Sequence, residues 1–340
     1  MDTLVTVIIP VYNREKVLSE TLESVLNQSH TNWECLIIDD GSTDDTIKVV
    51  NQFIKKDKRF NLYKRDSNHL KGPAACRNLG LFQAKGDYVI FLDSDDILHE
   101  NCLENRLKYV FKNPEYDVWV FNMAFLDGKN KGKICNYYPT DVSSKKEFLK
   151  MTLRYQLPFS VTCPLWRIEA LKDLKGFDES FLRLEDPDLH CRALSKQYRF
   201  LFNKTSAPDC YYRVGTNNTN RDEDVKFKDI FIKSFYQFID KYAGFKSEII
   251  DNNEVKKQLN ILLLRVFKDY ILNDKYFFKQ FEIFYSLGKN KKILNFYELV
   301  ILFITKRYKK NEWDKISGTG FYKIRKIIFK KIDKVDSLNE

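Results

Sequence analysis

Short apolar runs alternate with amphipathic stretches along the first 122 residues, and this alternation constrains the fold more than any other feature. The run from Leu4 to Val11 is rich in β-branched residues, as expected for a buried strand. Apolar residues then recur with helical spacing between residues 18 and 26, and similar strand and helix pairs follow. Strands that alternate with helices predict an α/β fold with a doubly wound, mostly parallel sheet covered on both faces.

The organisation changes after residue 123, where the pattern becomes mixed, and from Asp222 onward it is almost wholly helical. A polar stretch at residues 215–220 separates these parts. We therefore predict a domain over residues 1–218 and a helical C-terminal region over residues 219–340. Further strands are predicted at residues 34–39, 61–64, 88–92 and 118–122, helices at 73–83 and 144–155, and a hairpin through Gly128 and Gly132.

Composition excludes several classes of protein. Hydrophobic residues make up 44% of the chain and charged residues 31%, with only 12 Gly and 8 Pro, which excludes disordered and collagenous chains. The seven Cys are widely spaced, which argues against a zinc site or a disulfide framework and favours a reducing compartment. The first residues lack the cationic region of a signal peptide. We expect a cytoplasmic protein.

Positive charge is concentrated near the C-terminus. The net charge is +10, and residues 289–334 alone hold 14 Lys or Arg against 4 Asp or Glu. The apolar run Ile293–Thr305 is too short to cross a bilayer, which takes about 20 residues. Residues 321–332 read as a basic amphipathic helix. Residues 289–335 are therefore predicted to associate with the inner face of the cell membrane, the alternative being a basic helix packed on the main domain. No nucleic-acid motif is present.

Polar residues follow several predicted strands, and in a parallel sheet these positions share one edge, where ligands bind. The turn after the first strand has no glycine, which argues against a classical dinucleotide site. Asp93 and Asp95 follow the strand at residues 88–92 at alternate positions, so they can divide contacts between a ribose and a phosphate-bound Mg²⁺ or Mn²⁺. The alternative is that Ser94, Asp95 or Asp96 caps the next helix.

Five motifs in order resemble the family 2 glycosyltransferases over roughly residues 4–215. They are Val5–Asn13 (VTVIIPVYN), Ser24–Ser29 (SVLNQS), Ile38–Asp44 (IDDGSTD), Ala75–Gly80 (ACRNLG) and Phe91–Asp96 (FLDSDD). The resemblance implies a GT-A fold, a nucleotide-sugar donor that is usually linked to UDP, a divalent cation and inversion at the anomeric carbon.

The same resemblance implies roles for individual residues of the donor site. Asp40 is expected to accept a hydrogen bond from the uracil N–H, with Asp39 supporting its turn. Asp93 is expected to face the ribose and Asp95 to bind Mn²⁺ or Mg²⁺. The remaining expected donor contacts are Pro10 and Tyr12 in the nucleoside pocket and Lys71 near the diphosphate, where a solvated lysine is the alternative.

The acceptor side is implied by Glu185-Asp186-Pro187, which matches the acidic pair of the family. Asp186 is the expected general base, the alternative being a helix N-cap followed by Pro. Glu185 and Trp166 are expected at the acceptor, although a core role is equally open for Trp166. Many family members carry a metal-binding His after a Tyr-Arg pair, which is absent after Tyr212-Arg213. The third metal ligand therefore stays open.

These expectations together describe a metal-dependent inverting hexosyl- or N-acetylhexosaminyltransferase. Its acceptor is expected to be a hydroxyl of a glycan or of a lipid-linked oligosaccharide in surface polysaccharide, O-antigen or capsule biosynthesis. Two alternatives stay open. One is a catalytically silent nucleotide-sugar-binding scaffold of a polysaccharide assembly complex, and the other is a nucleotidyltransferase, which would be expected to carry a Gly-rich basic loop after the first strand.

Overall fold

A computed structural model describes residues 3–66, 68–128, 131–135, 144–204, 206–214, 225–272, 274 and 276–310. The chain divides into two compact units, which we call the sheet unit and the helical unit. The sheet unit comprises Met1–Phe148 and Leu157–Thr219, and the helical unit comprises Leu149–Gln156 and Asn220–Glu340.

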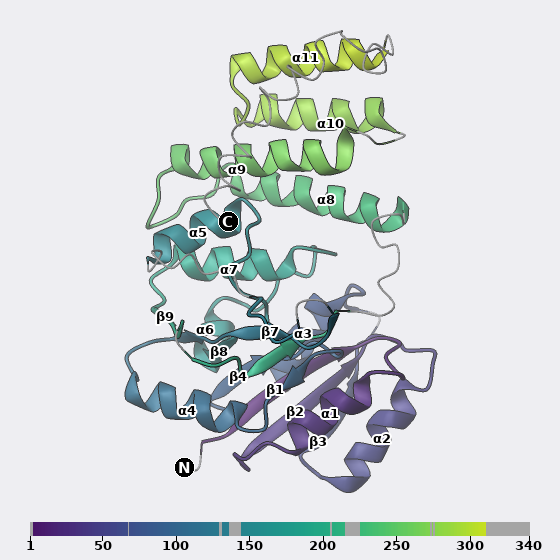
Figure 1. Cartoon of the computed structure of the whole chain (residues 1–340), viewed down its shortest axis with the longest axis vertical. Coiled ribbons are helices and arrows are strands. Elements are labelled where there is room, and N and C mark those ends of the chain that lie inside the picture. Colours follow the sequence, from purple (N-terminus) through teal and green to yellow (C-terminus); the bar gives the residue numbers. More distant parts are fainter. Residues whose placement is uncertain are drawn as a thin grey trace. The chain divides into compact units, whose positions relative to one another are not determined.

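A seven-stranded sheet forms the centre of the sheet unit, in the order β3-β2-β1-β4-β8-β6-β9. The strands β1 to β4 are parallel, and β8 runs antiparallel to both β4 and β6 (Figure 1). A second sheet has the order β5-β10-β7. The strands are β1 Val5–Val11, β2 Trp33–Asp39, β3 Phe60–Lys64, β4 Tyr88–Phe91, β5 Ile97–Leu98, β6 Val118–Val120, β7 Met123–Phe125, β8 Pro164–Arg167, β9 Phe200–Phe202 and β10 Cys210–Tyr212.

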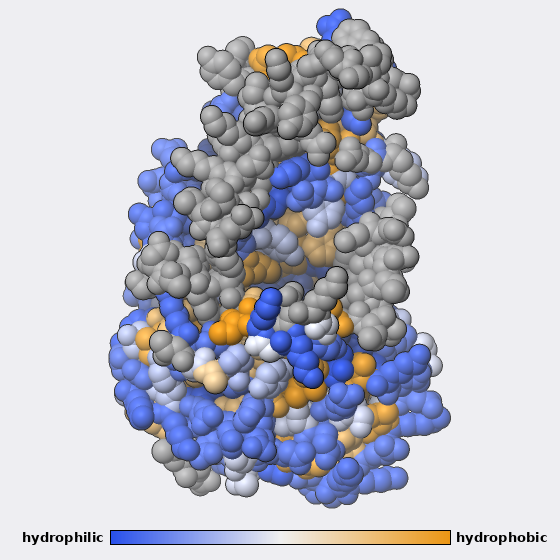
Figure 2. All heavy atoms as spheres, in the orientation of Figure 1, coloured by the Kyte–Doolittle hydropathy of each residue, from blue (hydrophilic) through white to orange (hydrophobic). Residues whose placement is uncertain are grey.

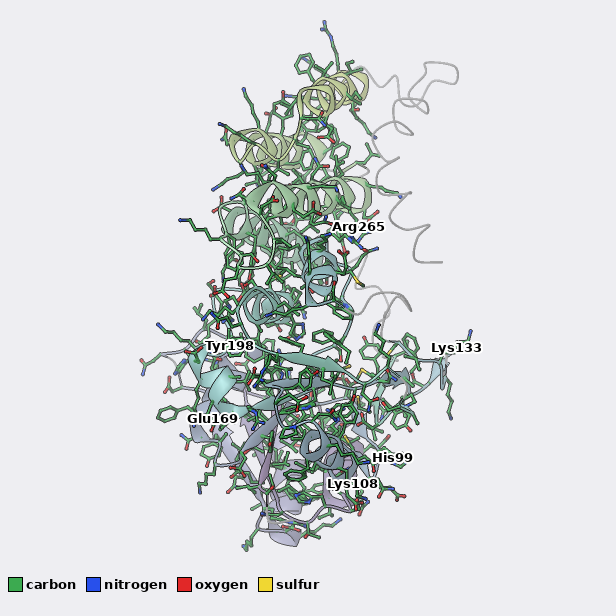
Figure 3. All side chains as sticks on the ribbon, turned by 90° about the vertical axis from the view of Figure 1, so that its left-hand side faces the viewer. His99, Lys108, Lys133, Glu169, Tyr198 and Arg265 are labelled. Atoms are coloured by element: carbon green, nitrogen blue, oxygen red, sulfur yellow. The ribbon has the colours of Figure 1, made fainter. Side chains whose placement is uncertain are left out.

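Helices cover the large sheet because each buries one apolar face and leaves the other in water. On α4, for example, Leu103 and Leu107 are buried while Lys108 points outward and pairs with Glu104 at 2.6 Å (Figure 3). The surface of this unit is mostly hydrophilic in the view of Figure 2. The helices of the sheet unit are α1 Leu18–Leu26, α2 Thr46–Lys56, α3 Pro73–Gln83, α4 Cys102–Lys112, α5 Lys145–Leu153, α6 Ile168–Asp173 and α7 Glu185–Ser195, of which α5 continues into the helical unit.

The helix α3 packs against β1 and β2. A methyl group on Gly80 would lie only 2.5 Å from Cγ2 of Ile8, so the glycine is what permits this approach. Gly72 precedes the helix with φ of +142°, a backbone conformation that other residues rarely adopt. Both glycines therefore fix where α3 stands, and with it the side chains that α3 carries toward the sheet edge.

The helical unit is a stack in which each helix follows its neighbour along the chain (Figure 1). Its elements are α8 Val225–Tyr242, α9 Asn252–Val266, a π-helical turn at Phe267–Ile271, α10 Phe277–Asn290 and α11 Phe296–Lys310. Aromatic rings from the turn and α10 fill its interior, where Phe267 and Phe284 lie 5.0 Å apart between ring centroids. None of the helices in the described part of the chain is both long and apolar enough to cross a membrane.

Several expectations for the fold are confirmed. The alternating strands and helices lie where the apolar pattern predicts them, and the sheet is mostly parallel. The predicted boundary between residues 218 and 219 stays a prediction, because residues 215–224 lie outside the described residues. The pattern did not reveal that residues 149–156 belong with the helical unit. The predicted amphipathic helix at residues 321–332 lies outside the described residues.

The helix α11 begins at Phe296, inside the apolar run Ile293–Thr305. Asn295 and Glu298 form a reciprocal cap at the beginning of α11, with Asn295 Oδ1 accepting from Glu298 N at 3.0 Å and Glu298 Oε2 accepting from Asn295 N at 2.9 Å. The same Glu298 oxygen accepts from Asn260 at 2.9 Å. The acidic residue inside this apolar run therefore has a structural role.

Candidate active site

The polar ends of three parallel strands meet at one edge of the large sheet. β1 lies between β2 and β4, and it pairs in parallel with both. Tyr12 follows β1 directly, Asp40 follows β2, and Asp93 lies two residues beyond β4. Pro10 is the penultimate residue of β1, opposite Ile38. The strand order thus brings the expected nucleoside and ribose contacts to the same edge, as predicted.

Asp39 shapes the turn that presents its neighbour Asp40. Its carboxylate accepts hydrogen bonds from the backbone N–H groups of Gly41 at 3.2 Å and Ser42 at 3.1 Å, and Gly41 has a φ of +87°. Asn13, in the loop after β1, accepts a hydrogen bond at 2.8 Å from the backbone N–H of Thr43, in the loop after β2. The loops after β1 and β2 are therefore bound to each other, and the structure agrees with a supporting role for Asp39.

Asp40 is buried and paired with Arg65, a residue to which sequence reasoning assigned no role. The Nε of Arg65 donates to Asp40 Oδ1, and its Nη1 donates to the carbonyl oxygens of Asp66 and His69, both at 2.7 Å. Arg65 therefore holds the chain after β3 against the end of β2. A carboxylate next to a guanidinium offers a hydrogen-bond acceptor and a hydrogen-bond donor side by side. This pair suits a ligand whose edge presents a donor next to an acceptor.

Tyr12 and Lys71 are brought together. The Lys71 ammonium lies 3.7 Å from the centroid of the Tyr12 ring, a cation–π contact, and Tyr12 is 41% exposed. Tyr12, expected at the nucleoside, and Lys71, expected at the diphosphate, therefore lie side by side at the edge of the sheet, where a ligand has access to both.

Arg77 connects the donor side of the edge to the expected base. Its side chain is only 3% exposed, and its guanidinium Nη2 donates to Asp93 at 2.8 Å. Its Nη1 donates to Glu185 at 3.1 Å and to Asp186 at 3.0 Å. The sequence offers two signals for Arg77, a single cation within the mostly apolar helix α3 and its position in the Ala75–Gly80 motif, and neither reveals which carboxylates it meets.

Asp186 stands in the first turn of α7, which begins at Glu185. Leu184 occupies the cap position in the left-handed region, with φ of +68°, a costly conformation for a leucine. No side-chain cap is formed, so the N-cap alternative for Asp186 does not apply. The surrounding protein desolvates the carboxylate and raises the pKa of Asp186 to about 8, with Arg77 opposing the rise and Glu185 adding to it. A base with such a pKa operates near neutral pH.

Asp95 and Asp96 follow β4 and differ in environment. The Asp95 side chain is 35% exposed, with Oδ2 at 3.8 Å from a guanidinium nitrogen of Arg14. Asp96 is buried, which raises its pKa, and it accepts from the backbone N–H of Arg213 at 3.1 Å. Arg213 also donates through Nε to the Asp95 carbonyl at 3.0 Å. Neither residue caps α4, whose cap position is Asn101.

The chemistry of Asp95 fits a divalent cation only in a site built largely by the substrate. Within the described ranges, no group of three or more His, Cys, Asp and Glu side chains is arranged to hold a metal ion. A hard cation such as Mg²⁺ commonly binds one or two carboxylates and takes its other ligands from phosphates and water. A partly exposed carboxylate at this edge is consistent with that mode.

The position of Trp166 differs from the expected acceptor contact. It lies in β8 with no exposed surface, and its ring stacks with that of His190 at a centroid distance of 6.4 Å. A fully buried ring offers no face to an acceptor sugar, so the predicted acceptor contact is wrong and the core alternative holds. His190 is also buried, which lowers its pKa to about 3, and it is a packing residue. Glu185 is mostly buried against Arg77, and its acceptor role stays a prediction.

The sequence profile described as Glycosyl transferase family 2 matches residues 6–173. An uncharacterised glycosyltransferase of Haemophilus influenzae is 48% identical over 173 residues, which are 51% of this chain and 65% of that protein. One of Methanocaldococcus jannaschii is 30% identical over 199 residues, covering 58% and 67%. The Escherichia coli protein named UDP-Glc:α-D-GlcNAc-diphosphoundecaprenol β-1,3-glucosyltransferase WfgD is 42% identical over 127 residues, covering 37% and 46%. The chain thus spans about half to two thirds of the length of these relatives.

Among solved structures, Staphylococcus aureus TarS residues 1–349 in complex with UDP-GlcNAc superposes with a TM-score of 0.65. The alignment covers 89% of this chain and 87% of that one, at 20% sequence identity. This likeness shows a shared fold and confirms the predicted GT-A architecture.

Proposed function

The chain belongs to glycosyl transferase family 2, and from this premise we propose that it transfers a hexosyl or N-acetylhexosaminyl group from a UDP-sugar to a hydroxyl group, with inversion and with the help of Mn²⁺ or Mg²⁺. One observation carries the proposal: Arg77 joins a carboxylate at the nucleotide edge, Asp93, to a carboxylate with a raised pKa, Asp186. The proposal is supported because a donor contact at Asp93 and a base at Asp186, held on one guanidinium, would serve one reacting centre.

The pair formed by Asp40 and Arg65 matches the edge of a uracil base. Uracil presents an N–H beside carbonyl oxygens, so the free Asp40 oxygen accepts from the N–H while the guanidinium donates to a carbonyl oxygen. Tyr12 and Pro10 line the same edge beside the base, and Lys71 provides positive charge for the diphosphate. The UDP-GlcNAc in the TarS complex supports a uridine nucleotide as the proposed donor carrier.

Replacing Asp40 by Asn is expected to weaken UDP binding by about tenfold to a hundredfold, because it removes a charge-assisted hydrogen bond to the base. Isothermal titration with UDP measures this. Asp45→Asn is the matched control, because Asp45 is 60% exposed at the start of α2 and pairs only at the surface with Lys48. Equal UDP affinity in wild type and Asp40→Asn would contradict the assignment.

The proposed transfer needs a base and a stabilised leaving group. Asp186 takes the proton from the acceptor hydroxyl while its oxygen attacks the anomeric carbon, and the bond from that carbon to the diphosphate breaks on the opposite face. Asp95 is the residue that would hold a divalent cation, which when bound neutralises charge on the diphosphate. Asp93 contacts the ribose and so fixes the donor relative to Asp186.

A donor-hydrolysis screen over UDP-sugars, with Mn²⁺ or Mg²⁺, tests the activity itself. Release of UDP from at least one donor is expected. Binding of UDP-sugars without any release of UDP, also in the presence of glycan and lipid-linked acceptors, would instead identify a silent nucleotide-sugar-binding scaffold. The nucleotidyltransferase alternative is disfavoured because the loop after β1 is tied down by Asn13 and has no glycines to cradle phosphates.

The proposed acceptor is a lipid-linked oligosaccharide of surface polysaccharide biosynthesis, reached at the inner face of the cell membrane. The name of the related WfgD protein specifies a sugar linked to diphosphoundecaprenol as the acceptor, which supports a lipid-linked acceptor. The outer face of α11 supports a membrane partner. Val300, Phe303 and Ile304 are 40%, 54% and 36% exposed at helical spacing, and Arg307 and Lys310 continue the same face with positive charge. Anionic lipid is the partner that matches both features.

Phe303→Ser is expected to lower binding to phosphatidylglycerol-containing vesicles by about tenfold, because a Phe side chain contributes about 1.5–3 kcal/mol when fully buried. Co-sedimentation at low and high salt measures the apolar and the electrostatic contributions. Phe82→Ser is the control, because Phe82 is 81% exposed but lies on α3 of the sheet unit. If both variants sediment like wild type, α11 does not bind the membrane.

A further inference from the structure

Arg77 is a single buried cation shared by three carboxylates. Asp93 comes from the end of β4, whereas Glu185 and Asp186 come from the first turn of α7. The three contacts lie between 2.8 and 3.1 Å, and they use two different nitrogens of the guanidinium. Because the guanidinium is planar and rigid, fixing one nitrogen on Asp93 also fixes the direction in which the other meets Asp186.

The residues packed around Arg77 hold its guanidinium in place, so the guanidinium does not follow a carboxylate that moves. The Arg77 guanidinium carbon lies 5.3 Å from the centroid of the Phe177 ring, and that ring packs edge-on against Phe91 of β4 at 5.0 Å. The close approach of α3 to β1 at Gly80 fixes the backbone one turn away. Arg77 is therefore held by β1, β4 and the segment that carries Phe177.

We propose that Arg77 is a positioning residue that couples the donor site to the base, by holding Asp93 and Asp186 on one rigid guanidinium. This inference rests on the proposed function, in which Asp93 contacts the donor ribose and Asp186 takes the acceptor proton. Arg77 touches neither substrate in this scheme, and acts only through the carboxylates that it aligns.

The coupling between Asp93 and Asp186 also has an electrostatic component, because the neighbouring charges set the pKa of Asp186. The charged groups that face Asp186 are Arg77 from α3, Asp93 from the end of β4 and Glu185 from its own helix. Desolvation, Glu185 and Asp93 raise the pKa of Asp186, and Arg77 lowers it. Loss of the Arg77 contact therefore raises the pKa of the base further, whereas loss of the Glu185 charge lowers it.

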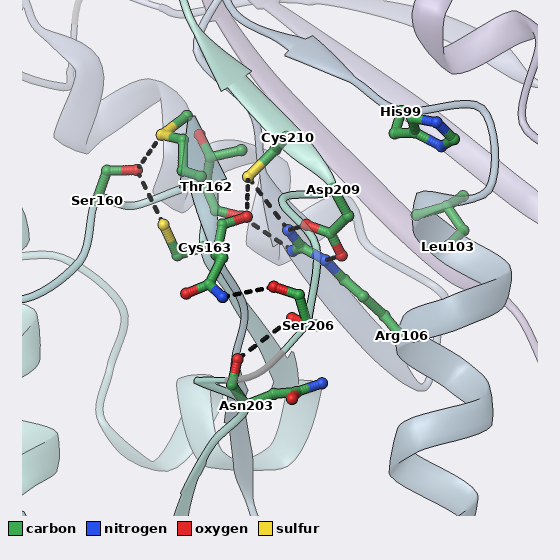
Figure 4. Close-up of polar contacts among 12 residues, drawn as sticks. His99, Leu103, Arg106, Ser160, Thr162, Cys163, Asn203, Ser206, Asp209 and Cys210 are labelled. Carbon is green, nitrogen blue, oxygen red and sulfur yellow. Dashed lines mark hydrogen bonds and ion pairs between the residues drawn. The ribbon is translucent and has the colours of Figure 1, made fainter. Parts of the chain in front are cut away.

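Two variants separate this role from a merely structural one. Arg77→Lys keeps a positive charge but replaces the rigid fork by a single ammonium that does not reach both sides. Glu185→Gln keeps the shape of the side chain and removes one negative charge from the shared nitrogen. Arg106→Lys is the matched control, because Arg106 is also buried in the sheet unit. It pairs with Asp209 at 2.6 and 2.8 Å and donates to the Thr162 carbonyl, and not to the carboxylates that Arg77 holds (Figure 4).

The measurement is kcat/KM against pH, which reports groups of the free enzyme, together with kcat, the KM for donor, and thermal unfolding. A base must be deprotonated to act, so activity rises with pH through the pKa of Asp186. Arg77→Lys is expected to move this rise to higher pH by about one unit or more, and Glu185→Gln to move it to lower pH. Arg77→Lys should also lower kcat by about 10²-fold, because the base is misplaced.

Arg106→Lys is expected to unfold at a lower temperature while its pH profile stays that of wild type. Shifts of Arg77→Lys and Glu185→Gln in the same direction, or no shift in either, would overturn the proposal. If Arg77→Lys does not fold, the Glu185→Gln profile decides alone, because an unshifted profile is incompatible with the coupling. A wild-type chain that transfers no sugar would instead overturn the proposed function, so the two failures are distinguishable.

Discussion

Asp186→Asn is expected to lower kcat by about 10²- to 10⁴-fold while UDP binds as in wild type, because it removes the proposed base and leaves the donor edge intact. The substitution keeps the shape of the side chain. Arg77 still pairs with Asp93 and Glu185, so the buried cation stays compensated. Steady-state turnover with the donor identified in the hydrolysis screen, combined with UDP titration, measures both quantities.

Asp188→Asn provides the matched control on the same helix. Asp188 is completely buried and pairs with Arg192 at 2.8 Å, one turn along α7. Its loss is expected to lower thermal stability, because the partly buried Arg192 loses its carboxylate partner, and to leave kcat of the folded protein near wild type. Near-normal turnover in Asp186→Asn, or an equal loss of kcat in Asp188→Asn, would remove Asp186 as the base.

Asp95→Ala is expected to abolish the gain in UDP affinity that Mn²⁺ or Mg²⁺ provides, and to lower kcat by about 10²- to 10³-fold. The physical reason is that the part of the chain the structure describes has no cluster of three acidic, His or Cys ligands that replaces this carboxylate. Calorimetric titration of UDP with and without Mn²⁺ separates the metal-dependent part of binding from the rest.

The neighbouring Asp96 serves as the control for Asp95. It is buried and bonded to the backbone of Arg213, so Asp96→Asn is expected to change stability while the response to Mn²⁺ is kept. An unaltered metal response in Asp95→Ala would show that the cation, if required, is held elsewhere. A response lost in both variants would point to a disturbed loop after β4 instead of a specific ligand.

Most of the architecture of the sheet unit is predictable because its signals are local. The run Leu4–Val11 contains β1 (Val5–Val11), which is buried on both faces, so its apolar character is visible without knowledge of its partners. The turn at Asp39 is equally local, because its carboxylate bonds to backbone groups only two and three residues away. Such features depend on short stretches of sequence.

The features that sequence reasoning missed depend on distant residues. Arg77 meets Asp186, which is 109 positions away, and Arg65 meets Asp40 across 25 positions, so no spacing rule predicts either pair. Trp166 was ambiguous because an aromatic residue satisfies both a core and a sugar site, and only the sheet order, with β8 between β4 and β6, decides for the core. Residues 149–156 joined the helical unit through contacts such as Lys150 with Glu254.

A crystal structure with UDP and Mn²⁺ bound would show whether the carboxylates at this edge of the sheet act on one nucleotide diphosphate. We expect the uracil N–H on Asp40, the cation on Asp95 and the open end of the diphosphate facing Asp186. A nucleotide bound at another surface, or a diphosphate that points away from Asp95 and Asp186, would contradict this expectation.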